Sequence, residues 1–273
     1  MTPPKNRRYV YKASAVGAAG YLSNPTVHRI DVQASCALPV SGGYGSNRVE
    51  NFRYKELISF RAAYTQVSGT WSSKDRGSNS LATATIEKLD ILGIVTADLV
   101  VAHVASRHRA QGQPGDPDQP EIVTVGSYFK NLRIAGRKIE IDLDDKLFSD
   151  KPRFNDLREH ATSAKDFQPR LLKPFYANPD HVHAEELQVA EPAVRADDYK
   201  IACTLVKDCE SLPPGVKREG HVFHIPHFGT VHLAECICTP YKKRLTMLRL
   251  EMGSPAEGDA ALADAEGGGR WEP

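Results

Sequence analysis

The sequence predicts an all-β fold, an antiparallel β-sandwich that carries a partly helical, Pro-rich insertion. Apolar and polar residues alternate along many short runs, and clusters of turn-forming residues separate these runs. A period of two is typical of half-buried strands. Regular short strands with turns between them are typical of sandwiches and barrels. The chain has 273 residues, of which 41% are hydrophobic and 25% are charged, as in ordinary globular proteins.

The strands are predicted in chain order from this alternation. In TVHRIDVQASC one face of a strand holds His28, Ile30, Val32, Ala34 and Cys36. The turn cluster SGGYGSN follows at 41–47, and SSKDRGSNS at 72–80 is a hairpin loop. Further strand-like runs lie at 58–71, 81–91, 94–106, 121–128, 132–143, 199–206, 221–225, 230–239 and 244–252.

Three regions are expected. Residues 1–147 and 199–252 form the β-sandwich domain, and residues 148–198 form an insertion with short helices. In SDKPRFNDLREHATSA, Ser149 or Asp150 is expected to cap a helix that has Pro152 in its first turn. The acidic, Gly- and Ala-rich tail at 253–273 is expected to be disordered, because it offers few large apolar groups.

The sandwich core is predicted from the longest alternating runs. The residues expected to be buried are Leu89, Ile91, Ile94, Leu132, Ile134, Ile139, Val231 and Leu233.

Charge and cysteine content restrict the function classes. The formal net charge of +1 gives no electrostatic footprint for nucleic acid, and no apolar run reaches the roughly 18 residues of a membrane span. Five cysteines do not form a disulfide framework, so reduced thiols are expected. These signals favour a cytoplasmic location, with the cell surface or secretion by an unrecognised route as the alternative.

Residues 221–239, HVFHIPHFGTVHLAECICT, concentrate histidine and cysteine in one predicted hairpin. With a turn at 226–229, Phe223 would oppose His232, and His232 would share a face with Cys236. These two residues would then be roughly 13 Å apart at 3.3 Å per residue. One ion cannot bind both at the 2.0–2.3 Å of a metal–ligand bond. We therefore expect no metal and no cofactor at this hairpin.

A second histidine pair supports a metal-dependent alternative. HVHAEE at 181–186 is similar to the HxH strand of cupin jelly rolls, and Pro226–His232 is similar to their later hairpin but one residue longer. The resemblance implies an enzyme that holds Zn or Fe with His181, His183, Glu185 or Glu186, and His232.

Four segments together resemble the choice-of-anchor β domains of bacterial surface proteins. They are ASAVGAAG, ATIEKLDILGIVTADLVVAHVAS, VGSYFKNLRIAGRKIEI and IPHFGTVHLAE. The resemblance implies a β-sandwich and no catalytic residue. The favoured function is therefore a non-catalytic interaction or assembly module that binds a protein or carbohydrate surface, with a homo-oligomer left open. Trp71 and Tyr44 are the candidates for ligand contact.

Overall fold

The computed structural model describes residues 8–24, 27–74, 76–110, 119–172 and 199–272. Its strands are β1 Tyr9–Asn24, β2 His28–Ala37, β3 Gly43–Tyr54, β4 Ile58–Ser72, β5 Gly77–Ile91, β6 Val95–Arg109, β7 Glu121–Val123, β8 Tyr128–Lys130, β9 Arg133–Ile134, β10 Arg137–Lys138, β11 Glu140–Leu143, β12 Ile201–Thr204, β13 Val206–Glu210, β14 Lys217–Glu219, β15 Val222–Ile225, β16 Gly229–Thr239, β17 Lys242–Met252 and β18 Glu257–Trp271. Its helices are α1 Leu147–Asp150, α2 Phe154–Ser163 and the 3₁₀ helix η1 Gln168–Arg170.

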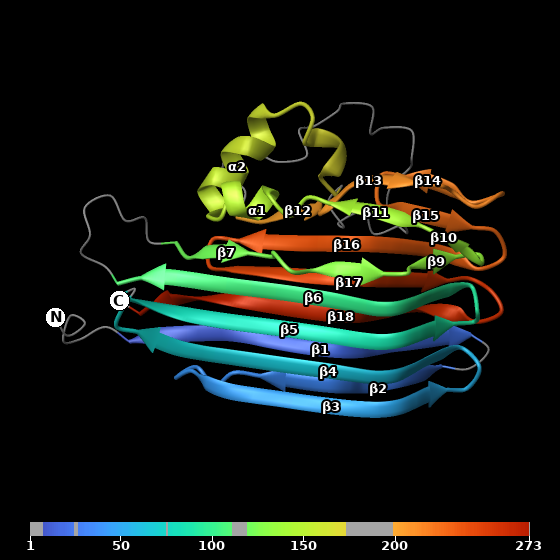
Figure 1. The fold of residues 1–273 in the computed structure, drawn as a ribbon, viewed down its shortest axis with the longest axis horizontal. Coiled ribbons are helices and arrows are strands. Elements are labelled where there is room, and N and C mark those ends of the chain that lie inside the picture. Colours follow the sequence, from blue (N-terminus) through green and yellow to red (C-terminus); the bar gives the residue numbers. More distant parts are fainter. Residues whose placement is uncertain (1–7, 25–26, 75, 111–118, 173–198, 273) are drawn as a thin grey trace.

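Two antiparallel sheets pack face to face and confirm the predicted sandwich (Figure 1). Sheet A has the order β14-β15-β16-β17-β18-β1-β2, and β12 also pairs with β16. Sheet B has the order β10-β9-β6-β5-β4-β3, and β7 and β8 also pair with β6. A small third sheet joins β11 to β13. The long edge strands β2 and β3 therefore lie together at one side of the sandwich, and short strands and helices lie at the other (Figure 1).

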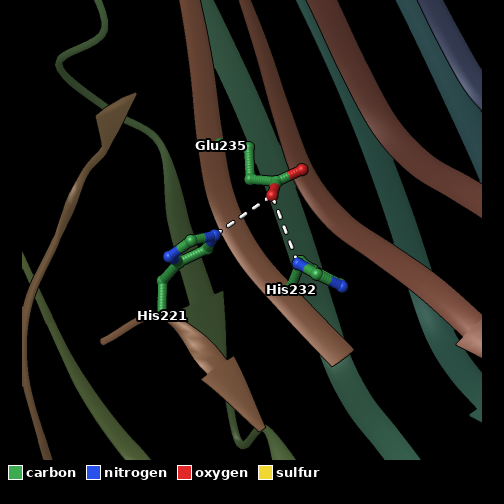
Figure 2. Close-up of side chains that lie close together, drawn as sticks. All are labelled: His221, His232 and Glu235. Carbon is green, nitrogen blue, oxygen red and sulfur yellow. Dashed lines mark hydrogen bonds and ion pairs between the residues drawn. The ribbon is translucent and has the colours of Figure 1, made fainter. Parts of the chain in front are cut away.

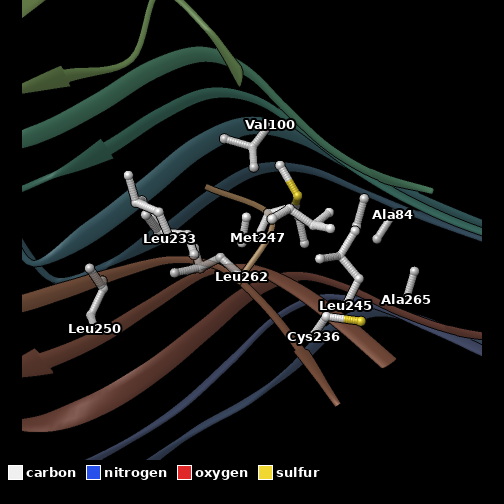
Figure 3. Packing of buried hydrophobic residues seen from close by; sticks show 14 of the residues in the cluster. Ala84, Val100, Leu233, Cys236, Leu245, Met247, Leu250, Leu262 and Ala265 are labelled. Carbon is white, nitrogen blue, oxygen red and sulfur yellow. The ribbon is translucent and has the colours of Figure 1, made fainter. Parts of the chain in front are cut away.

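The core between the sheets confirms the alternation argument. Leu233, Leu245 and Leu262 of sheet A pack toward Val100 and Ala84 of sheet B (Figure 3). Seven of the eight predicted core residues are buried, namely Leu89, Ile91, Leu132, Ile134, Ile139, Val231 and Leu233. Ile94 is only half-buried, because it lies in the turn between β5 and β6.

The prediction of a disordered tail is wrong. Residues 257–271 form β18, which pairs with β1 on one side and β17 on the other near the middle of sheet A. Its many small residues bury little apolar area each, but they let the two sheets approach closely. A Cβ on Gly267 would come within 2.9 Å of Val104 Cγ1 in sheet B. The alternation also missed β1 and β3 as strands.

The insertion packs on the sandwich through a short helical segment. Phe148 of α1 and Phe154, Leu157 and Ala161 of α2 belong to the same buried core as the sheets. The predicted helix start was wrong, because Ser149 and Asp150 lie inside α1 and α2 begins after Pro152 and Arg153. Residues 173–198 of the predicted insertion lie outside the described residues. Within the described ranges, no helix has the length and apolar character needed to cross a bilayer.

A line of backbone kinks crosses sheet A and decides which side chains share a face. Ala234, Ala263 and Ala34 have φ values of 51°, 51° and 48°, in the left-handed region that L-residues seldom adopt. The line continues through Gly17 of β1 and Met247 of β17. These two residues, like the three alanines, have no directly opposite partner in the strand registers. The in–out alternation shifts by one residue there, as at a β-bulge.

Candidate functional site

Three metal-type donors meet on the face of sheet A that points away from the core. His232 and Glu235 come from β16, and His221 lies in the turn between β14 and β15 (Figure 2). His232 and Glu235 are three residues apart, which would place them on opposite faces of a regular strand. The kink at Ala234 brings both to the outer face, while Leu233 and Cys236 point into the core.

The donor atoms are close together. Glu235 Oε1 lies 3.0 Å from His221 Nε2 and 3.3 Å from His232 Nδ1, and the two imidazole centroids are 5.8 Å apart. The three side chains are only 10–12% exposed. One ligand atom from each residue lies within 4.8 Å of the others. Two imidazoles and one carboxylate are also the donor set of non-haem iron sites.

Arg249 of β17 already occupies this donor set. It pairs with His232 across the strands, and its Nε and Nη2 donate to Glu235 Oε2 and Oε1 at 2.6 and 2.9 Å. Nη2 also lies 2.8 Å from His232 Nδ1, which is shorter than the 3.3 Å to Glu235. We therefore assign His232 Nδ1 as an acceptor and place its proton on Nε2, 3.1 Å from Thr230 Oγ1.

The charge of Glu235 is fixed by these contacts. Burial alone would raise the pKa of Glu235, but hydrogen bonds from Arg249 and His221 outweigh burial and hold the pKa well below its usual range. The carboxylate is thus ionised and paired with a guanidinium. A cation could bind the two imidazoles and Glu235 only after the guanidinium of Arg249 had moved away. The arrangement as found is a largely buried ion-pair network, which Glu251 extends through contacts with Arg249 and Thr230.

The structure corrects the predicted hairpin. His232 opposes Val222 rather than Phe223, because Ile225 pairs with Gly229. His232 and Cys236 lie on opposite faces, and Glu235 joins His232 instead. The proposed cupin partners His181, His183, Glu185 and Glu186 lie outside the described residues. The His221–Glu235 contact could not be predicted from the alternation of polar and apolar residues, because nothing in that alternation marks the left-handed backbone of Ala234.

The two candidates for ligand contact do not form a common surface. Tyr44 opposes Ser68 in the β3–β4 pair, whereas Trp71 lies three residues further along β4 and so points to the opposite face. Trp71 is 40% exposed and makes an edge contact with Trp271 at 6.0 Å. Tyr44 is 64% exposed on the edge strand.

A family model described as a domain of unknown function (DUF8256) matches residues 9–239. The matched range ends with β16, although β17 and β18 complete the same sheet. No curated protein and no solved structure matches the chain.

Proposed function

We propose that this chain, which belongs to the DUF8256 family, is a non-catalytic interaction module that pairs its edge strand β3 with an extended strand of another protein chain. The observation that supports the proposal is the exposure of β3. All twelve residues of this strand are exposed or half-buried, and only β4 pairs with it among the described strands. Its outer row of backbone N–H and C=O groups therefore faces no further strand among the described residues, although the Arg48 N–H donates to Asn47 Oδ1.

The edge strands on the two sides of the sandwich differ in length. At the side opposite to β3, sheet A ends in β14, with three residues, and sheet B ends in β10, with two. Short edge strands of this kind protect a sheet against unwanted pairing. β3 has neither a short length nor a proline, and its left-handed residue, Asn51, lies near its end. Residues 44–50 are thus an unkinked edge of the kind used in recognition by strand addition.

A second copy of this chain is the partner whose strand fits this edge. Two β3 strands related by a two-fold axis at Asn47 would pair antiparallel over the whole unkinked stretch 44–50. Tyr44 would then oppose Glu50, and Ser46 would oppose Arg48, so that no like charges stand directly opposite each other. Such an interface is self-complementary and closed, as in most homodimers.

A carbohydrate surface is less well supported than a protein partner. Stacking on sugars would use exposed aromatic rings that share one face. Tyr44 and Trp71 point to opposite faces of sheet B, and Trp71 contacts Trp271.

Disulfide trapping tests the proposed pairing. Asn47→Cys places a thiol on the two-fold axis, so that mild oxidation should link two copies covalently. Gln66→Cys is the matched control, because Gln66 is exposed on the neighbouring strand β4, away from the edge. We expect a covalent dimer for Asn47→Cys and none for Gln66→Cys or the unmodified chain. Equal dimer yields from all three chains would contradict the proposal.

A metal-dependent enzyme remains the second candidate, since the His221, His232 and Glu235 donors lie within 4.8 Å of one another. Its test is the Zn and Fe content of protein produced with each metal, compared with that of His232→Ala. His224→Ala is the control, because His224 lies on the adjacent strand and its side chain is 43% exposed. One equivalent of metal that is lost only in His232→Ala would support the enzyme. Protein without bound metal would contradict the enzyme, and Glu235 would then be paired with Arg249 alone as a structural ion pair.

A further inference from the structure

Three cysteines and one lysine meet on the inner face of sheet A. Cys203 of β12 pairs across the strands with Cys236 of β16, and Cys238 of β16 pairs with Lys243 of β17. The cysteines are fully buried, and Lys243 is 1% exposed. This cysteine–lysine cluster lies on the opposite face of β16 from His232 and Glu235.

The thiols converge more closely than strand geometry requires. Cys236 and Cys238 share a face, so their Cα atoms are separated by two residues, or about 6.6 Å. Their Sγ atoms are nevertheless only 3.6 Å apart, and the Cys203 thiol interacts with both. Two thiolates bound to one tetrahedral Zn²⁺ at 2.3 Å would be about 3.8 Å apart. The separation of the Cys236 and Cys238 sulfurs is therefore close to that of metal ligands.

Lys243 supplies an independent observation. Its Nζ donates to the carbonyl oxygens of Ile122 and Pro152 at 2.6 and 2.9 Å, and it lies 3.9 Å from the centroid of the Phe148 ring. A nitrogen over an aromatic face is favourable for an ammonium ion. No carboxylate among the described residues forms a salt bridge with this nitrogen, and a buried charge without a counter-charge is strongly unfavourable.

The three cysteines and, more weakly, Asp156 are the acidic groups that act on Lys243 in the core. Thiols carry negative charge when they bind a metal ion, because thiolate is the form that coordinates. Three thiolates, one divalent ion and one ammonium ion sum to zero charge. Soft thiolate ligands select Zn²⁺ and Cu⁺ among common metals.

We propose that Cys203, Cys236 and Cys238 bind one thiophilic metal ion, Zn²⁺ or Cu⁺, and that Lys243 balances the charge of the thiolates. Binding releases the thiol protons and involves no redox step. Charge neutrality favours Zn²⁺ over Cu⁺. The ion joins β12 to β16, and Lys243 extends the connection to α1 and β7.

Metal titration of the full chain tests the site. The protein is purified under reducing conditions, treated with a chelator and titrated with Co²⁺, Zn²⁺ or Cu⁺ alone. We expect one equivalent to bind, with thiolate-to-cobalt charge-transfer absorption for Co²⁺ and a higher Tm for Zn²⁺ or Cu⁺. Zn²⁺ binding identifies the divalent site, and binding of Cu⁺ alone identifies a monovalent one.

Matched variants separate this cluster from the rest of the molecule. Cys203→Ser should abolish the charge-transfer absorption and the rise in Tm. Cys209→Ser and Cys36→Ser should retain both, since these cysteines are outside the cluster. His224→Ala should also retain both, because this histidine lies outside the cluster and its side chain is 43% exposed. Absence of charge-transfer absorption and of a Tm shift in the unmodified chain would overturn the proposal, whether or not the variants fold. Loss of binding in His232→Ala with retention in Cys203→Ser would also overturn it.

Discussion

Glu235 shows how one backbone residue sets the chemistry of a side chain. The left-handed φ of Ala234 turns Glu235 to the face of His232, where Arg249 of the next strand meets it with two hydrogen bonds. A guanidinium and a carboxylate are stable in such a largely buried place only when they are paired with each other. The charge of this cluster therefore depends on Arg249 as much as on the two histidines.

Removal of one partner should expose this dependence. Arg249→Met leaves Glu235 ionised and without its guanidinium, and we expect a loss of about 3 kcal/mol in the free energy of unfolding. The double variant Arg249→Met/Glu235→Gln should lose less than the sum of the two single variants. Lys138→Met is the control, because Lys138 and Glu140 form an exposed pair that contributes about 0–1 kcal/mol. Urea denaturation measures all four. Strict additivity would show that the two groups do not interact.

The kink line is the feature of the strands that alternation could not reveal. Period two assigns the faces correctly on each side of the kink, which is why the predicted core was mostly right. It fails across Ala234, because one extra residue shifts every later side chain to the other face. His232 and Cys236 were predicted to share a face, whereas the kink between them places them on opposite faces.

Gly17 should be essential to this kink line. A Cβ at this position would come within 2.9 Å of the Gln33 carbonyl oxygen and of Ala63 Cβ in sheet B. We expect Gly17→Ala to lower the free energy of unfolding by about 1–3 kcal/mol through overpacking. Gly253→Ala is the control, since its nearest contact would be an ordinary 4.0 Å to the Phe228 carbonyl oxygen. Equal stabilities of the two variants would contradict the proposed role of the kink.

The helical segment is held to the sandwich by a titratable contact. Arg170 at the end of η1 donates to Asp144 at 2.6 Å and to the carbonyl oxygen of Thr204. Burial would raise the pKa of Asp144, but Arg170 and the backbone N–H groups of Leu147 and Lys146 hold it below its usual range.

This contact should make the stability depend on pH in acid. Because the folded pKa of Asp144 is below the unfolded value of about 3.9, its contribution is complete above the unfolded pKa. It is lost as the pH falls through the folded pKa. We expect Asp144→Asn to reduce the slope of stability against pH below about pH 4. Asp145→Asn, at an exposed neighbouring position, should leave the slope unchanged. Thermal unfolding at a series of pH values measures both slopes.

At the scale of the whole molecule, the sequence pattern was sufficient to predict the fold class. It was not sufficient to predict every strand or the residues that meet at the candidate site. Alternation and turn clusters reveal strands with large apolar residues, such as β5 and β6. They do not reveal β18. Its alanines and glycines are suited to a strand that packs closely against the other sheet, which the sequence pattern does not show. The candidate site depends on pairing between β16, β17 and the β14–β15 turn, which no local pattern records.

The open side of the sandwich leads to the central claim, that β3 pairs with a strand of a second copy. In the proposed register Ser46 of one copy stands opposite Arg48 of the other. Ser46→Glu should therefore strengthen the dimer, and Ser46→Lys should weaken it. Ser46 is exposed, so neither change should disturb the fold. Gln66→Lys, on the neighbouring strand, should have no effect.

Sedimentation velocity over a range of protein concentrations is the most direct measurement. The account predicts a concentration-dependent dimer whose dissociation constant falls in Ser46→Glu, rises in Ser46→Lys and is unchanged in Gln66→Lys. A chain that sediments as a monomer at every concentration, or a dimer that responds equally to the three substitutions, would contradict the pairing of β3 with a second copy.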